Sequence, residues 1–284
     1  MTEIFCASAE RCGCTLNIMA VLSVDLACRR WSDLGVVVLS HAPLRLTAPA
    51  VTCEILSLDS PGFDAAHDRG PIDPEVLAGR LNHLCAVRDI RILMLDGPQA
   101  WKSGANGLKH ARVGERQLNT AAKTGLPGMV KPASYRTFAE FCMDVYDALC
   151  RRGWRRLETR PQPAAPDPAV ASLQRVLVES YPHAAWTSLG LKPLPAKRRA
   201  RVSDLAEAYG ALRAVFPFTT NRPPNHDQLQ AIVAGLPGLA LEEHNTAGLR
   251  IVGNPPRREQ GHWREGFIVL PLPPRTASSV RWLQ

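Results

Sequence analysis

Three acidic residues interrupt or end apolar runs in this chain: Asp25 within MAVLSVDLA, Asp96 at the end of IRILMLD, and Glu179 within VLVES. A charge in such a run cannot face a core without a partner. The carboxyl ends of strands in α/β sheets open onto the crevice where ligands bind. Carboxylates that converge there repel one another, and a divalent cation with all-oxygen ligation removes that repulsion. We therefore predict a Mg²⁺ or Mn²⁺ site at one edge of a sheet.

Each acid alone is weaker evidence than the three together. A strand-end aspartate often only caps a turn, and Asp96-Gly97 is a favourable turn pair. The prediction therefore depends on the order of the elements that carry the acids.

The apolar runs predict the order strand, strand, strand, helix, strand for the first hundred residues. Runs at 19–27 and 34–40, joined by a short polar link, are typical of a β-hairpin, and a third run follows at 51–58. Helical spacing covers 73–87, with Asp73-Pro74 as its start, before the strand at 90–96. Further helices are expected at 134–152, 183–189, 202–215 and 226–236, with strands at 176–180 and 267–270.

We predict one α/β domain over residues 19–284, preceded by an N-terminal arm of residues 1–18 that has no periodicity. Residues 97–133 are rich in Gly and Lys and are expected to form an insertion or an active-site loop. Residues 159–169 form a proline-rich connection.

Composition favours an anionic partner and gives no sign of a membrane segment. The chain has 284 residues, 45% of them hydrophobic, and a formal charge of +8 with a pI near 9.3. Such a balance attracts nucleic acid, although many basic proteins bind no polyanion. No apolar run approaches the roughly 20 residues of a spanning helix. The eight cysteines lie mostly in apolar runs, which indicates a reducing, cytoplasmic location.

One basic segment is a candidate contact for a nucleic-acid backbone, with a solvated surface as the alternative. Its residues are Lys197, Arg198, Arg199 and Arg201. No phosphate-binding P-loop and no serine-nucleophile elbow occur in the sequence, so NTPase and serine hydrolase functions lack support.

Several segments in order resemble domain-of-unknown-function family 429, whose members are predicted nucleases with a ribonuclease H-like fold. They are VLSVDLACRRWSDLGVVVLS, ILMLDGP, GERQLNTAAKTGLPG, VLVESYPHAAWTSLG and NHDQLQAIVAGL. The similarity covers roughly residues 19–271. It implies a mixed sheet with three antiparallel first strands, flanked by helices, with an insertion after the fourth strand.

The resemblance also implies roles for individual residues. Asp25, Asp96, Glu179 and Asp227 would be catalytic metal ligands for Mg²⁺ or Mn²⁺. Gln230 stands where a second acid is expected in the final helix, and its amide brings no negative charge, which would weaken a second ion. Glu115 with Arg116, and His183, occupy other positions that the family marks.

Two functions follow, and a third is less favoured. The leading hypothesis is a metal-dependent nuclease that hydrolyses phosphodiester bonds. The alternative is a catalytically inactive nucleic-acid-binding protein of the same fold. A nucleotide-binding or phosphotransfer protein would need Gly-rich phosphate loops, and the hairpin turn at 28–33 has no glycine. Asp227 also fits a purely structural role, in the first turn of a helix that Asn225 caps.

Overall fold

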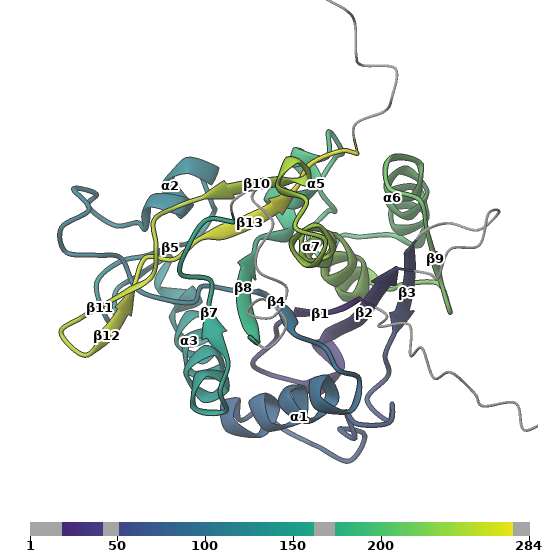
Figure 1. The fold of residues 1–284 in the computed structure, drawn as a ribbon, viewed down its shortest axis with the longest axis horizontal. Coiled ribbons are helices and arrows are strands. Elements are labelled where there is room, and N and C mark those ends of the chain that lie inside the picture. Colours follow the sequence, from purple (N-terminus) through teal and green to yellow (C-terminus); the bar gives the residue numbers. More distant parts are fainter. Residues whose placement is uncertain (1–18, 42–50, 162–173, 275–284) are drawn as a thin grey trace, which may run out of the picture.

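A computed structural model describes residues 19–41, 51–161 and 174–274. The N-terminal arm at 1–18 and residues 162–169 of the proline-rich connection lie outside these ranges. The described chain is a mixed α/β structure with a central sheet between layers of helices (Figure 1).

The central sheet contains antiparallel and parallel strands in the order β10-β13-β8-β4-β1-β2-β3-β9, with β7 also paired to β8. Strands β1, β2 and β3 are antiparallel neighbours, whereas β4 is parallel to β1 and β8 is parallel to β4. The strands are β1 (Ala20–Asp25), β2 (Gly35–His41), β3 (Val51–Ile55), β4 (Ile92–Asp96), β7 (Arg155–Arg156), β8 (Val176–Ser180), β9 (Phe218–Thr220), β10 (Leu249–Val252) and β13 (Ile268–Pro271).

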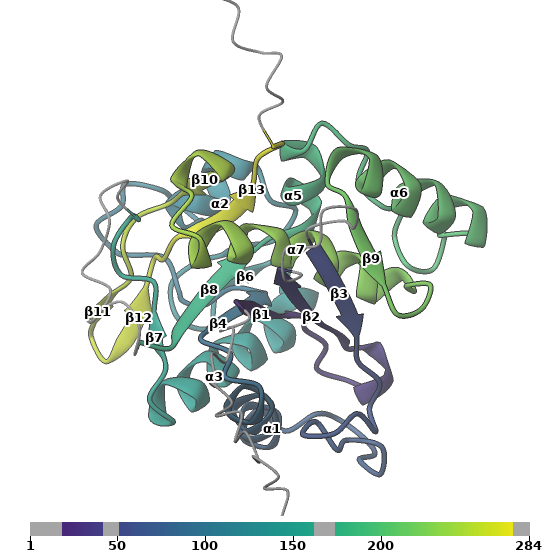
Figure 2. The same cartoon turned by 45° about the vertical axis from the view of Figure 1, so that its right-hand side comes forward.

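Helices cover both faces of this sheet. Helices α1 (Pro74–Val87) and α3 (Arg136–Arg151) pack on one face, and α5 (Pro182–Ser188) and α7 (His226–Glu242) pack on the other (Figure 2). Helix α6 (Val202–Val215) lies beside β9. In the described residues, no helix is both long and apolar enough to cross a membrane.

The predicted strands and helices are present, but strands β7, β9 and β10 of the central sheet were not predicted. Two hairpins outside this sheet are further differences. Residues 97–133 contain α2 (Val113–Leu118) and a hairpin of β5 (Lys123–Thr124) and β6 (Val130–Lys131). A second hairpin, β11 (Arg257–Glu259) with β12 (His262–Arg264), has no counterpart in the sequence prediction. These strands are two or three residues long, which is too short to show an alternating pattern.

Helix α7 continues to Glu242, beyond the predicted end at 236, although Pro237 lies inside it. A proline removes one intrahelical hydrogen bond. Close packing on the sheet compensates, because glycines bring the helix onto β1, β2 and β4. An added Cβ at Gly235 would lie 2.2 Å from Leu39 Cδ1 and 2.7 Å from Ser23 Cβ. The Ser23 hydroxyl donates to the Ala231 carbonyl of α7 at 2.7 Å.

Gly235→Ala should therefore destabilise the protein although alanine is the better helix former. We expect a loss of about 1–3 kcal/mol in the free energy of unfolding, because the methyl group forces α7 away from the sheet. Gly210→Ala in α6 is the matched control, since no atom lies within 4 Å of the added Cβ. That change should stabilise by about 0.5–1 kcal/mol. Urea unfolding measures both, and equal effects at the two positions would contradict the packing argument.

Candidate active site at the strand ends

The carboxyl ends of β1, β4 and β8 meet at one edge of the sheet because these strands are parallel. Asp25 lies opposite Asp96 in the β1–β4 pair, and Asp96 lies opposite Ser180 in the β4–β8 pair. Glu179 precedes Ser180. The prediction that Asp25, Asp96 and Glu179 share one edge is therefore confirmed.

The three acids do not share one face of the sheet. Residues opposite each other in a parallel pair lie on the same face, and successive residues alternate between faces. Asp25 and Asp96 therefore lie on the α7 face. Glu179 is paired with Leu95 and lies on the face covered by α1 and α3. The one-residue offset of Glu179 separates it from the two aspartates.

Asp25 and Asp96 form a partly buried carboxyl pair that shares a hydrogen bond. Burial, with repulsion from Asp96 and Asp227, raises the pKa of Asp25 well above its ordinary value. Burial raises the pKa of Asp96 to about 7, and Glu179 adds to the rise. Two carboxylates this close cannot both ionise cheaply, so in the metal-free protein the pair keeps a proton near neutral pH.

Asp227 is brought to this pair by the docking of α7. Gly35 of β2 lies opposite Asp25, and a Cβ at Gly35 would be 2.2 Å from the Asp227 carbonyl oxygen. The first turn of α7 therefore rests directly on the strand beside Asp25. The Asp227 carboxylate forms an ion pair with the Lys197 ammonium and lies 3.2 Å from His226 Nδ1. The predicted cap is also present, since Asn225 accepts from the Gln228 amide at 2.9 Å.

Gln230 of α7 is hydrogen-bonded to α5. Its Oε1 accepts a hydrogen bond from Trp186 Nε1 at 2.8 Å, and Trp186 is fully buried in α5. The side-chain oxygen of Gln230 is thus held against α5.

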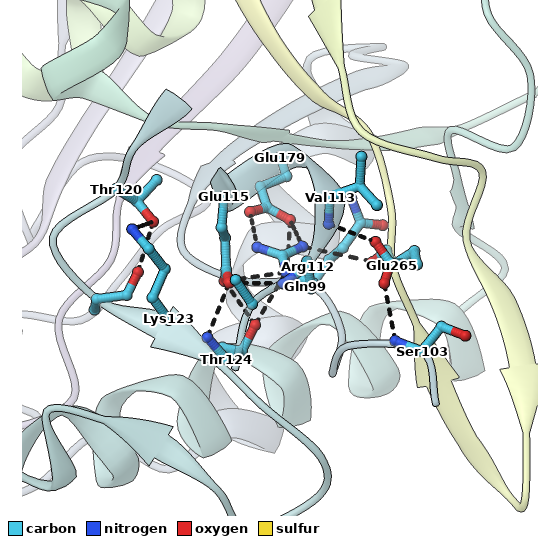
Figure 3. A network of polar contacts seen from close by, with 12 residues as sticks. Gln99, Ser103, Arg112, Val113, Glu115, Thr120, Lys123, Thr124, Glu179 and Glu265 are labelled. Carbon is cyan, nitrogen blue, oxygen red and sulfur yellow. Dashed lines mark hydrogen bonds and ion pairs between the residues drawn. The ribbon is translucent and has the colours of Figure 1, made fainter. Parts of the chain in front are cut away.

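Glu179 is held by a buried arginine that the sequence did not indicate. Figure 3 shows Arg112 between Glu179 and Glu115. Its Nη1 and Nη2 donate to the two oxygens of Glu179 at 2.7 and 2.5 Å, and its Nε donates to Glu115 at 3.1 Å. The backbone N–H of Gln99 adds a third donor to Glu179 at 3.0 Å. The Arg112 side chain is only 2% exposed.

The hydrogen bonds show that this cluster is ionised. Burial raises the pKa of Glu179, and the Arg112 charge opposes that rise. Burial lowers the pKa of Arg112, but Glu179 and Glu115 outweigh it and leave the value raised. A carboxylate that accepts three hydrogen bonds is in its charged form. The resemblance marked Glu115 with Arg116, but Arg116 is exposed and Arg112 is the partner.

Glu265 is a further acid that the sequence analysis did not single out, and it ties the insertion to the C-terminal segment. It is 1% exposed and accepts from the backbone amides of Ser103 and Val113, both at 2.8 Å (Figure 3). Asn106 Nδ2 donates to it at 2.6 Å. Residues 97–133 are therefore fixed beside the site by these hydrogen bonds.

A cavity of about 390 Å³ lies between Asp96 and the Arg112 cluster. Its lining is mostly apolar and includes Tyr135 and Tyr181. Apolar concave sites with a few polar groups are typical of ligand binding. Other members of the lining are Gly97, Pro98, Thr120, Ala121, Pro132, Ser180 and Ile268.

The predicted basic segment divides into two parts. The Lys197 ammonium turns towards the acids, pairing with Asp227 and lying 2.9 Å from Asp33. The other three residues, Arg198, Arg199 and Arg201, are exposed. All four residues stay predicted contacts for a nucleic-acid backbone, since the Lys197 side chain is itself 47% exposed.

Comparison of the chain with protein-family models, with curated proteins and with solved structures gives no significant match. The assignment of a function therefore depends on the geometry of this site.

Removal of the Arg112 charge should strongly destabilise the protein. Arg112→Met leaves Glu179 and Glu115 buried without a counter-charge, at a cost of about 3–5 kcal/mol in the free energy of unfolding. Arg136→Met breaks an exposed pair with Glu140 and should cost at most about 1 kcal/mol. The variant that also carries Glu115→Gln and Glu179→Gln should recover part of the loss. Similar losses for Arg112→Met and Arg136→Met in chemical denaturation would contradict this role.

The carboxyl pair should make the metal-free protein less stable as pH rises. The folded pKa of Asp96, about 7, lies above the unfolded value of 3.8, so its contribution is complete below pH 3.8 and is lost as pH passes 7. The loss is at most about 4 kcal/mol. Asp96→Asn should remove this pH-dependent loss. In EDTA, the free energy of unfolding of the variant should therefore rise relative to that of the parent between pH 4.5 and 8. Glu158→Gln, an exposed control, should follow the parent. Parallel stability curves for Asp96→Asn and the parent would argue against a shared proton.

Proposed function

We propose that this chain has a ribonuclease H-like fold and hydrolyses phosphodiester bonds of nucleic acid with Mg²⁺ or Mn²⁺ at Asp25 and Asp96. The observation that carries the proposal is the pair itself: two partly buried carboxyl groups lie side by side at parallel strand ends, with raised pKa values. Buried like charges are costly, and they are retained at sites that work on a ligand. A divalent cation is the ligand that relieves this repulsion.

The strand order supports the fold part of the proposal. Three antiparallel strands, β1 to β3, are followed by β4 and β8 on the other side of β1, both parallel to it. This is the mixed sheet that the resemblance to family 429 implies. Asp25 lies at the end of β1, and Asp96 lies at the end of the neighbouring strand β4.

The donors at the pair fit a magnesium-type ion. Mg²⁺ keeps several waters and is commonly bound by one or two carboxylates together with substrate phosphates. Asp25 and Asp96 would supply those two carboxylates. The ion, when bound, supplies positive charge to a phosphate and lowers the pKa of water. Glu179 is not needed as a ligand in this arrangement, because Arg112 already compensates its charge.

The cavity next to Asp96 would receive the nucleoside adjoining the scissile phosphate. Tyr135 and Tyr181 offer aromatic surfaces for a base, and base stacking on aromatic side chains tolerates any sequence. The exposed Arg198, Arg199 and Arg201 would contact the backbone further along the strand.

A catalytically inactive nucleic-acid-binding protein is the second candidate, and one observation favours it. Two of the four predicted ligands, Glu179 and Asp227, already pair with resident cations. Across residues 19–41, 51–161 and 174–274, no three His, Cys, Asp or Glu side chains form a group that could hold a metal ion.

Metal binding and cleavage separate the two candidates. We expect millimolar Mn²⁺ to raise the melting temperature by several degrees, since a ligand that binds only the native state at 100 times its Kd stabilises by about 2.7 kcal/mol. Asp25→Asn should abolish most of this rise and the cleavage of labelled single- and double-stranded DNA and RNA. Asp144→Asn, on α3 outside the pair, should change neither.

One result would favour the binding protein over the nuclease. Salt-sensitive binding of nucleic acid by the parent, with no thermal shift and no cleavage in Mn²⁺, would replace the nuclease with the binding protein.

A further inference from the structure

Lys197 lies on the irregular segment between α5 and α6, and its ammonium points at the acids of the site. It contacts Asp227 of α7 and lies 2.9 Å from Asp33 Oδ1 in the link between β1 and β2. Its charge also acts on Asp25, whose pKa it lowers. Acids from three separate elements therefore surround one cation.

The position of this ammonium is built into the fold. His226 Nε2 lies 3.0 Å from the Pro195 carbonyl oxygen, two residues before Lys197, so the segment is held at the first turn of α7. That turn rests on Gly35, where β2 has no Cβ. The ammonium is thus fixed relative to the Asp25–Asp96 pair by the same contacts that fix Asp227.

We propose that Lys197 is the resident second cation of the site, so that the protein binds one divalent ion at Asp25–Asp96 and the ammonium takes the place of a second ion at Asp227. This inference rests on the proposed metal site.

The ammonium keeps a donor for substrate. Lysine has three N–H groups, and among the described residues two acceptors, Asp33 and Asp227, are in contact with them. The side chain is 47% exposed, so the third N–H is accessible to an anionic oxygen. A tethered cation also differs from an ion in that no change in metal concentration removes it.

The test is the number of Mn²⁺ ions bound per chain, measured by calorimetry and by electron paramagnetic resonance. We expect one ion for the parent protein. Lys197→Met removes the ammonium from Asp227, while Asp33 keeps its pair with Arg30 at 2.8 Å, so this variant should bind two ions. Lys197→Arg keeps the charge and should bind one, and Arg198→Met, a matched change at the next, exposed residue, should also bind one. Lys197→Gln is a second neutral variant if Lys197→Met does not fold, as judged by circular dichroism.

Each other outcome is decisive. Two ions in the parent would overturn the inference, because the second place would be open despite Lys197. One ion in both neutral variants would also overturn it and reduce Lys197 to a tether for its segment. No Mn²⁺ bound by the parent or by any variant would instead remove the metal site of the proposed function, which is a different result from these two.

Discussion

The buried Arg112 cluster is the interaction on which the architecture of the site depends. The guanidinium joins Glu179 of β8 to Glu115 of α2, two carboxylates that would be prohibitively costly in this environment without it. The cluster makes the insertion one wall of the cavity and places that wall against the strand ends. Glu265 extends the same tie to the segment that leads into β13, through the amides of Ser103 and Val113. Segments distant in sequence are thus joined by buried ion pairs and hydrogen bonds.

The acids of the site differ in whether a cationic side chain pairs with them. Glu179 and Asp227 have cationic partners, and their charges are compensated in the protein as it stands. Asp25 and Asp96 share a hydrogen bond, and burial raises the pKa of both. Repulsion from Asp96 and Asp227 adds to the rise at Asp25, and repulsion from Glu179 adds to it at Asp96. A carboxyl pair with raised pKa values beside a cavity is the observation on which the proposed function rests.

Glycines at the interface between α7 and the sheet set the position of α7, and thereby the position of Asp227 in the site. Gly35 lets the first turn of the helix touch β2, and Gly235 and Gly238 let its later turns touch β1, β2 and β4. The distance between Asp227 and Asp25 is therefore a consequence of core packing. The segment that carries Lys197 is bound to the same helix turn through His226, so the cation follows the helix as well.

Local patterns in the sequence determined the principal strands and helices and the helix caps at Asp73 and Asn225. They also determined the sheet edge at which Asp25, Asp96 and Glu179 lie. Alternation, helical spacing and capping act between residues that are close in the chain, so the sequence alone reveals them. The strands of two or three residues were not predictable, since their pairing partners define them. Tertiary structure alone decided the rest of the site. The register of β8 places Glu179 on the opposite face of the sheet from Asp25 and Asp96. Arg112 pairs with Glu179, which lies 67 residues away in the chain. Trp186 donates a hydrogen bond to Gln230, and Lys197 pairs with Asp227. Each depends on which groups the folded chain buries together, because a buried charge or amide must take the nearest partner that packing provides.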